Sequence, residues 1–185
     1  MKVIDIGIGK IGVAENEDDE LPKSGLDAML VAAPLGSEVA LGDEISGVTS
    51  FAVKSAAKST KCDYPILCGC TTVFGKYRHV SVMTFSAGKL ADIADRTFNL
   101  CGEEFDESDT VKVLRLKRFD LGLLVDTDIL LAKNWRRICP YCDAIASISR
   151  QNASEEYAFV PTLASLFGKP YLAAFSTGDI LWGTP

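Results

Sequence analysis

Short apolar runs separated by polar loops dominate the chain, and most of them are the length of strands rather than helices. Strands are predicted at residues 3–8, 28–33, 66–73, 79–85, 111–116, 121–125, 144–148 and 171–175. The runs at 28–33 and 121–125 are apolar without alternation, which is typical of strands buried on both faces. Helical spacing occurs at residues 45–56 and 129–138, and again from Ser154 to Gly168. Pro161 either kinks this last helix or marks its true first turn.

Several predicted neighbouring strands have only short connections between them, while others are separated by helices. This arrangement favours mixed sheets covered by helices, and therefore an α/β fold with α+β-like character. A chain of 185 residues can bury one proper core but hardly two. We therefore predict a single domain spanning residues 1–185.

Charge and composition exclude several functional classes. The formal net charge is −6 and no basic stripe is present, which argues against nucleic-acid binding. No apolar run is long enough to span a bilayer, and the N-terminus lacks the pattern of a signal peptide, so neither a membrane partner nor export is predicted. The expected location is cytoplasmic, where the six cysteines would stay free thiols.

Three local motifs carry little functional weight. Residues 7–12 spell G-x-G-x-x-G, but an acidic loop and Pro22 follow where a dinucleotide site needs a helix. Cys139 and Cys142 form a CxxC pair after a predicted helix, where the helix dipole opposes a thiolate. No second pair of ligands accompanies it, and His79 is the single histidine. The sequence therefore predicts no metal and no cofactor.

The segment from Asp120 to Ile129 is more informative. A buried apolar strand ends abruptly in Asp126 and Asp128, and alternation predicts that both point to the same side of the strand end. Acids at the carboxyl end of a central strand often face a pocket. Asp128 has a simpler explanation as the N-cap of the following helix, whereas Asp126 has none.

The order of these elements resembles the nitrilase (carbon–nitrogen hydrolase) superfamily over most of the chain. The resemblance rests on DAMLVAAP, the helix near 45–60, ILCGC, HVSVMTF, the Ala87-Gly88 turn and the motif at 122–128. It implies a nitrilase-like αββα sandwich, truncated because the family's first helix is missing around residues 10–27. It also implies a homo-oligomer, formed as a dimer through helices flanking the motif. Trp135 and Ile138 would either supply that face or lie in the core.

The resemblance also places the family's catalytic positions. Leu35 stands at the position of the family's Glu, Arg96 at that of its Lys, and Asp126 at that of its nucleophilic Cys. Asp128 matches the Asp of the same motif. A further family Glu, which precedes a Phe, is matched by residue 103 or 104, both of which are glutamates.

Nitrilase chemistry needs a thiolate nucleophile, a Glu that moves protons and a Lys that stabilises the oxyanion. Because all three positions differ, we predict a catalytically inactive nitrilase-like protein with a binding, regulatory or subunit role. Arg96 and Asp126 are expected to form a charge-assisted pair with fork geometry, with a small-molecule ligand nearby.

Two alternatives remain open. One is a hydrolase that acts on an amide, nitrile or ester bond through a rebuilt acidic site of Asp126, Asp128, Arg96 and either Glu103 or Glu104. In that case Glu38 lies close enough in sequence to the vacated Glu position to point into the pocket or away from it. The weaker alternative is a metal or redox protein that uses the CxxC pair.

Overall fold

The structure is a computed structural model that describes residues 1–14, 19–32, 38–41, 50–99, 104–150 and 154–185. Within them, seven strands form a larger sheet in the order β1-β2-β3-β5-β6-β7, with β4 beside β5. These strands are β1 (Lys2–Asp5), β2 (Lys10–Ala14), β3 (Ala28–Val31), β4 (Glu38–Ala40), β5 (Ile66–Phe74), β6 (Tyr77–Ser86) and β7 (Lys89–Asp95). β2, β3 and β5 run parallel to one another, whereas β5, β6 and β7 are antiparallel. The sheet is therefore mixed, as predicted.

The smaller sheet has the strand order β12-β11-β10-β9-β8 within the same described residues. Its strands are β8 (Lys112–Arg115), β9 (Asp120–Leu123), β10 (Ala144–Ser149), β11 (Tyr171–Phe175) and β12 (Ile180–Gly183). The three inner strands are parallel and the two outer strands pair antiparallel to them. The carboxyl ends of β9 and β10 therefore meet at one edge of this sheet, and that edge holds the candidate site.

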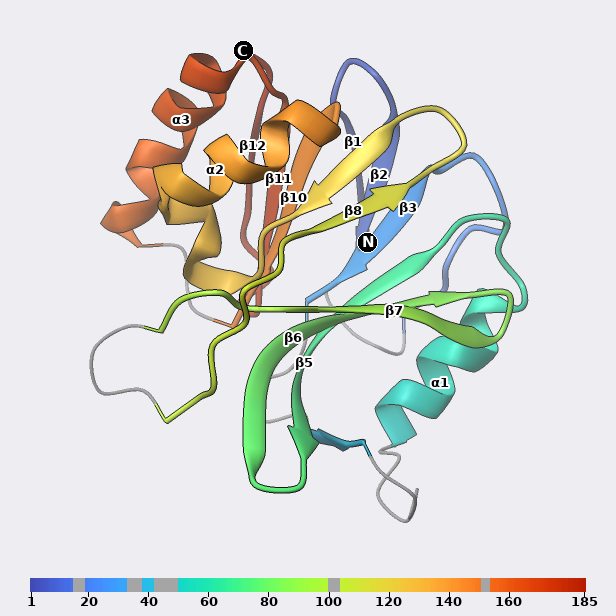
Figure 1. The fold of residues 1–185 in the computed structure, drawn as a ribbon. Coiled ribbons are helices and arrows are strands. Elements are labelled where there is room, and N and C mark those ends of the chain that lie inside the picture. The colour runs from blue at the N-terminus through green and yellow to red at the C-terminus, as the bar shows by residue number, and fades with distance from the viewer. Residues whose placement is uncertain (15–18, 33–37, 42–49, 100–103, 151–153) are drawn as a thin grey trace.

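Helices cover the outer faces of the two sheets, which gives four layers (Figure 1). Helix α1 (Ser50–Ser59) lies against the larger sheet, and α2 (Ala132–Ile138) and α3 (Val160–Phe167) lie against the smaller one. Three 3₁₀ turns complete the described elements: η1 (Asp126–Leu130), η2 (Cys139–Tyr141) and η3 (Glu155–Phe159). Pro161 occupies the first turn of α3, where its missing N–H is tolerated, so the second of the two readings of this proline is correct.

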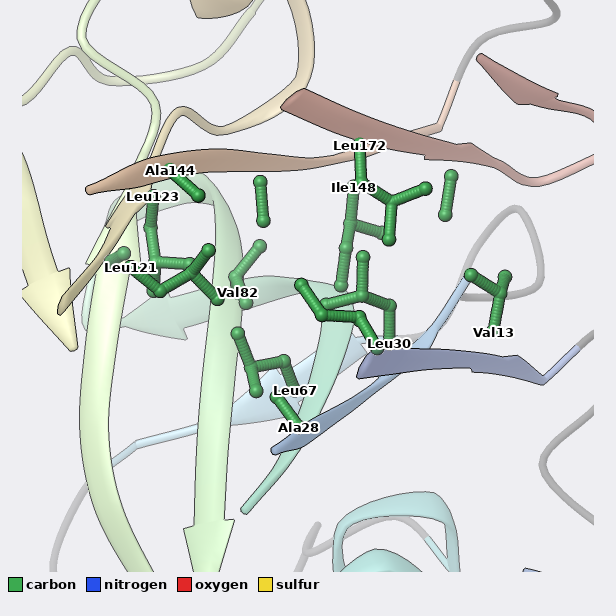
Figure 2. Packing of buried hydrophobic residues seen from close by; sticks show 14 of the residues in the cluster. Val13, Ala28, Leu30, Leu67, Val82, Leu121, Leu123, Ala144, Ile148 and Leu172 are labelled. Atoms are coloured by element: carbon green, nitrogen blue, oxygen red, sulfur yellow. The ribbon is translucent and has the colours of Figure 1, made fainter. Parts of the chain in front are cut away.

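The central core lies between the inner faces of the two sheets (Figure 2). Leu30 and Leu67 of the larger sheet face Leu121 and Leu172 of the smaller one, and all four are fully buried. Burying such a side chain contributes about 1.5–3 kcal/mol. A second cluster under α2 and α3 includes Trp135, which is fully buried with Ile138, so these residues belong to the core and do not form an exposed interface.

Several element boundaries differ from the prediction. The run at 3–8 is a strand that turns back into β2, so the three N-terminal glycines lie in and beside a hairpin and no helix begins there. Strands β2, β4, β7 and β12 were not predicted. The exposed edge positions of β7 and β12 blur the apolar pattern, β4 has only three residues, and β2 lies in the segment that was interpreted as a glycine-rich strand end followed by a loop. The helix expected at 129–138 is a 3₁₀ turn followed by a short α-helix. The first part of the helix expected at 45–56, residues 45–49, lies outside the described residues.

A loop takes the place expected for the first helix of the fold. In the described part of residues 10–27 there is a strand and an irregular segment but no helix. Leu21 and Leu26 of this segment pack against the buried outer-face residues of the larger sheet. A Cβ on Gly12 would lie 2.8 Å from Leu26 Cδ1, so the loop approaches the sheet closely. The Tyr64 hydroxyl donates to the carbonyl of Pro22 and ties the loop to the strand β5 side.

None of the helices formed by the described residues is both long enough and apolar enough to cross a membrane.

Candidate functional site

Asp126 lies where the chain leaves β9 and enters η1. Val125 is still extended, and the next residue has a φ of 54°, in the left-handed region. Apart from Ala87, it is the only described non-glycine residue with a positive φ. Such a conformation costs of order 1–3 kcal/mol and persists only when surrounding contacts hold it. The turn points the Asp126 side chain inward, toward the edge of the larger sheet.

Arg96 and Asp126 form a fully buried ion pair. Arg96 is the residue directly after β7, and its guanidinium Nη1 lies 2.7 Å from Asp126 Oδ2. Both side chains are at most 1% exposed. The predicted pairing is therefore present, but it is not bidentate, because Arg96 Nη2 donates instead to Oδ1 of Asn99 at 2.6 Å.

The other carboxylate oxygen of Asp126 is also occupied. Its Oδ1 accepts hydrogen bonds from Ser149 Oγ at 2.7 Å and from the backbone N–H of Arg150 at 3.2 Å. Arg150 Nε lies 4.0 Å from Oδ2. The Ser149 hydroxyl also contacts the Tyr157 hydroxyl at 2.9 Å, and burial raises the pKa of that tyrosine to about 12. Asp126 is thus at the centre of a closed polar network contributed by β7, β10 and η3.

Asp128 has a different role from its neighbour. Its Oδ2 accepts the backbone N–H of Thr97 at 2.8 Å and its Oδ1 accepts the Thr97 hydroxyl at 2.9 Å. Asn134 Nδ2 donates to the same hydroxyl oxygen at 2.9 Å. Burial raises the pKa of Asp128 to about 6, although the Thr97 hydrogen bonds and the Arg96 charge oppose the shift. The N-cap prediction for Asp128 is therefore wrong: its carboxylate joins the two sheets and does not cap a helix.

Three arginine side chains surround the ring of Phe105. The guanidinium carbon lies 4.5 Å from the ring centroid for Arg150, 5.5 Å for Arg96 and 5.8 Å for Arg78. These distances are within the range of cation–π contacts. Phe105 is half-buried and also packs on the core between the sheets. The phenyl ring therefore lies beside the guanidinium of Arg96, the cation of the buried ion pair.

The segment that carries this ring is fixed at the residue after it. Asp106 donates its N–H to the carbonyl of Arg78 at 2.6 Å, and its Oδ2 accepts the Arg78 N–H at 2.7 Å. Nδ1 of His79 lies 2.9 Å from the Asp106 carbonyl oxygen. The single histidine of the chain therefore contacts the segment beside the site and has a structural position on β6.

The structure does not bring all of the remaining predicted site residues to the Arg96–Asp126 pair. Glu104 is exposed, unlike the buried Arg96 and Asp126, so the rebuilt acidic site is not assembled around it. Leu35 and Glu103 lie outside the described residues. Glu38 is half-exposed and pairs with Arg78 at the rim of the site.

Sequence reasoning missed the groups that complete the site. Ser149, Arg150 and Tyr157 contact Asp126 or one another, yet each of the three lies more than twenty residues from Asp126 in the sequence. The available signal was topological: β10 is parallel to β9, so residues that follow both strands meet at one edge. Thr97 and Asn134 gave no signal in the sequence pattern.

The CxxC pair has the properties of core cysteines. Cys139 and Cys142 are buried free thiols, and burial raises the pKa of both, that of Cys142 to about 12. A reactive or metal-binding cysteine needs the opposite shift. The described residues also contain no group of three or more His, Cys, Asp or Glu that could hold a metal ion. The raised pKa values of the two thiols argue against the redox alternative.

Comparison with known proteins gives matches by structure only. No protein-family model matches the chain, and no curated protein matches its sequence. Its structure is similar to that of Saccharomyces cerevisiae Nit3, a nitrilase-superfamily member, with a TM-score of 0.69 and 11% identity over 86% of this chain and 73% of Nit3. An amidase of the same superfamily from Nesterenkonia gives a TM-score of 0.64 and 14% identity over 87% of this chain and 74% of the amidase.

A larger enzyme contains a similar part. The glutamine-dependent NAD⁺ synthetase of Acinetobacter baumannii matches with a TM-score of 0.61 and 12% identity over 86% of this chain, which spans only 37% of that protein. These similarities show the fold. The predicted α/β sandwich of nitrilase type is therefore confirmed.

Proposed function

We propose that this chain is a nitrilase-superfamily protein that has lost catalysis and retains a binding, regulatory or subunit role. The observation that carries this proposal is the environment of Asp126, the residue that the sequence resemblance aligns with the family's nucleophile. Its carboxylate is fully buried and bound on both oxygens by Arg96, Ser149 and the Arg150 backbone. A nucleophile needs a lone pair that is accessible to the substrate, whereas this carboxylate is fully buried and both of its oxygens accept hydrogen bonds from the chain itself.

The replacement of lysine by arginine supports the same proposal. A lysine ammonium can direct a compact charge at a developing oxyanion, whereas the Arg96 guanidinium is already held between Asp126 and Asn99. In this arrangement the guanidinium is engaged by groups of the chain itself and is not directed at a substrate oxygen. The former catalytic centre then serves as a structural joint between the two sheets.

The direct test is a screen of purified protein for hydrolysis of amides, nitriles, ureas and esters. We expect no turnover above that of a preparation carrying Asp126→Ala. Asp109→Ala, at an exposed carboxylate, is the matched control, and circular dichroism must show that both variants are folded. Turnover that is kept in the control and lost in Asp126→Ala would refute the proposal and support the rebuilt hydrolase site. The one observation in favour of that alternative is the left-handed φ of Asp126, since strained residues cluster at catalytic positions.

We further propose that the chain forms a homo-oligomer through the outer face of α3. This face carries Phe159 and Leu166, which are 69% and 72% exposed, together with Pro161, Thr162 and Ser165. The last three and Leu166 line a shallow depression of about 500 Å³. None of the five side chains is charged, which is unusual for an exposed helix face of an acidic protein.

Sedimentation of wild-type protein and of Leu166→Glu tests this interface. We expect a dimer for the wild type and a monomer for the variant. Val53→Glu, on the exposed face of α1, is the matched control and should leave the dimer intact. A monomeric wild type would remove the proposed interface.

A cytoplasmic location is also part of the proposal, supported by the five free cysteines among the described residues.

A further inference from the structure

The cluster of arginines beside the buried ion pair holds two groups that the chain itself supplies from separate segments. One is the phenyl ring of Phe105, which lies on Arg150, Arg96 and Arg78. The other is the carboxylate of Glu38, which pairs with Arg78 from the three-residue strand β4. The guanidinium of Arg78 contacts both groups, so the ring and the carboxylate are neighbours on either side of one side chain.

We propose that this cluster is a binding site for a small aryl-alkanoic acid, whose aromatic ring and carboxylate replace those of Phe105 and Glu38. The ring would lie on Arg150 and Arg96, and the carboxylate would bind Arg78. The inference rests on the binding role proposed above and names the chemical class of the ligand. A single molecule that carries both groups makes both contacts in one binding event, and these contacts must offset the translational and rotational freedom that it loses on binding.

The local structure allows the exchange. The Glu38–Arg78 pair is exposed on both sides, 50% and 49%, and such pairs contribute only about 0–1 kcal/mol. Phe105 is half-buried on a segment that has no regular secondary structure. The neighbouring Asp106 holds that segment on β6, so the Phe105 side chain can leave the site while its chain stays attached.

The ligand gains contacts that the resident groups already show to be favourable. Each guanidinium–ring contact is worth about 0.5–2 kcal/mol, depending on how far the pair is removed from water. A carboxylate–guanidinium contact is charge-assisted and can be bidentate. An aliphatic acid would lack the guanidinium–ring contact, and an aromatic amide would lack the carboxylate–guanidinium contact. These two kinds of molecule are therefore the control ligands.

His79 provides the measurement, because it is the only histidine and its Nδ1 contacts the Asp106 carbonyl beside Phe105. Protein labelled with ¹⁵N-histidine is titrated with 3-phenylpropionate, and the imidazole resonances are followed. We expect a saturable shift in the wild type. Affinity should fall about tenfold or more in Arg78→Gln and for 3-phenylpropanamide, and should rise up to about fivefold in Glu38→Gln. Arg115→Gln, at an exposed arginine of β8, is the matched control and should bind like the wild type.

Phe105→Leu keeps an apolar side chain but removes the competing ring, so it should bind 3-phenylpropionate more tightly. The absence of a saturable shift in both the wild type and folded Phe105→Leu would overturn the inference. Equal affinities in Arg78→Gln, Arg115→Gln and the wild type would overturn it as well. A different result would refute the proposed loss of catalysis, namely hydrolysis of 3-phenylpropanamide that disappears in Asp126→Ala. The titration with 3-phenylpropionate would then still decide whether the binding site exists.

Discussion

Removal of either partner of the buried Arg96–Asp126 pair should strongly destabilise the protein. Both side chains are at most 1% exposed, so each single substitution leaves a polar or charged group without its counter-charge in the interior. Breaking such a pair costs about 3–5 kcal/mol. For a domain of this size, that corresponds to a decrease in Tm of roughly 6–20 °C.

The substitutions Arg96→Met and Asp126→Asn, alone and combined, form a double-mutant cycle. Arg96→Met leaves the Asp126 carboxylate with Ser149 and the Arg150 backbone N–H as its remaining donors. Asp126→Asn keeps the shape but turns an amide toward the guanidinium. The double variant lacks the conflict in either single variant, so its loss should be smaller than the sum of the two.

Urea unfolding followed by circular dichroism measures the free energies of unfolding. We expect a coupling energy of about 1.5–3 kcal/mol. The exposed Glu38–Arg78 pair is the control, and Glu38→Gln should change stability by less than about 1 kcal/mol. A loss below about 1 kcal/mol in Arg96→Met, or strictly additive losses in the double variant, would show that the pair does not hold the sheets together as inferred.

Three further predictions follow from individual contacts. The pKa of Asp128 is about 6 in the folded state and 3.8 ordinarily, so the folded state binds this proton more tightly than the unfolded state does. The contribution of Asp128 to the free energy of unfolding is therefore fully present below about pH 4 and is lost as the pH rises through 6. Urea midpoints of the wild type should therefore fall between pH 5 and pH 7 more steeply than those of Asp128→Asn, and equal slopes would contradict the assignment. Gly122→Ala should destabilise by about 1–3 kcal/mol in thermal unfolding, because its Cβ would lie 2.9 Å from Cys142 Sγ, and an unchanged Tm would show that this contact relaxes freely. In a timed reaction with a thiol reagent, the half-buried Cys62 should react before unfolding and Cys139 and Cys142 only during it, so rapid labelling of the pair would revive a redox role.

Sequence alone determined the layers of this protein. The run at 28–33 is apolar without alternation, which predicts a strand that is covered on both faces. The structure buries its described residues 28–32, with side chains in the core between the sheets and in the core on the outer face of the larger sheet. The Pro161 and Gly168 signals also located the last helix correctly. Strands β7 and β12 escaped notice because a half-exposed edge strand needs no strong apolar pattern.

The resemblance in the order of the motifs placed Arg96 and Asp126 in one site, and the expectation that their opposite charges pair is met in the structure. What closes the site depended on tertiary structure. Parallel pairing of β9 with β10 places Ser149 and Arg150 against Asp126, and the chain's return along β6 brings Phe105 over Arg96. These contacts join residues far apart in sequence, and their side chains carry no periodicity that a linear pattern could reveal. Only the register between strands decides which of them meet, and that register is set by the packing of the whole core.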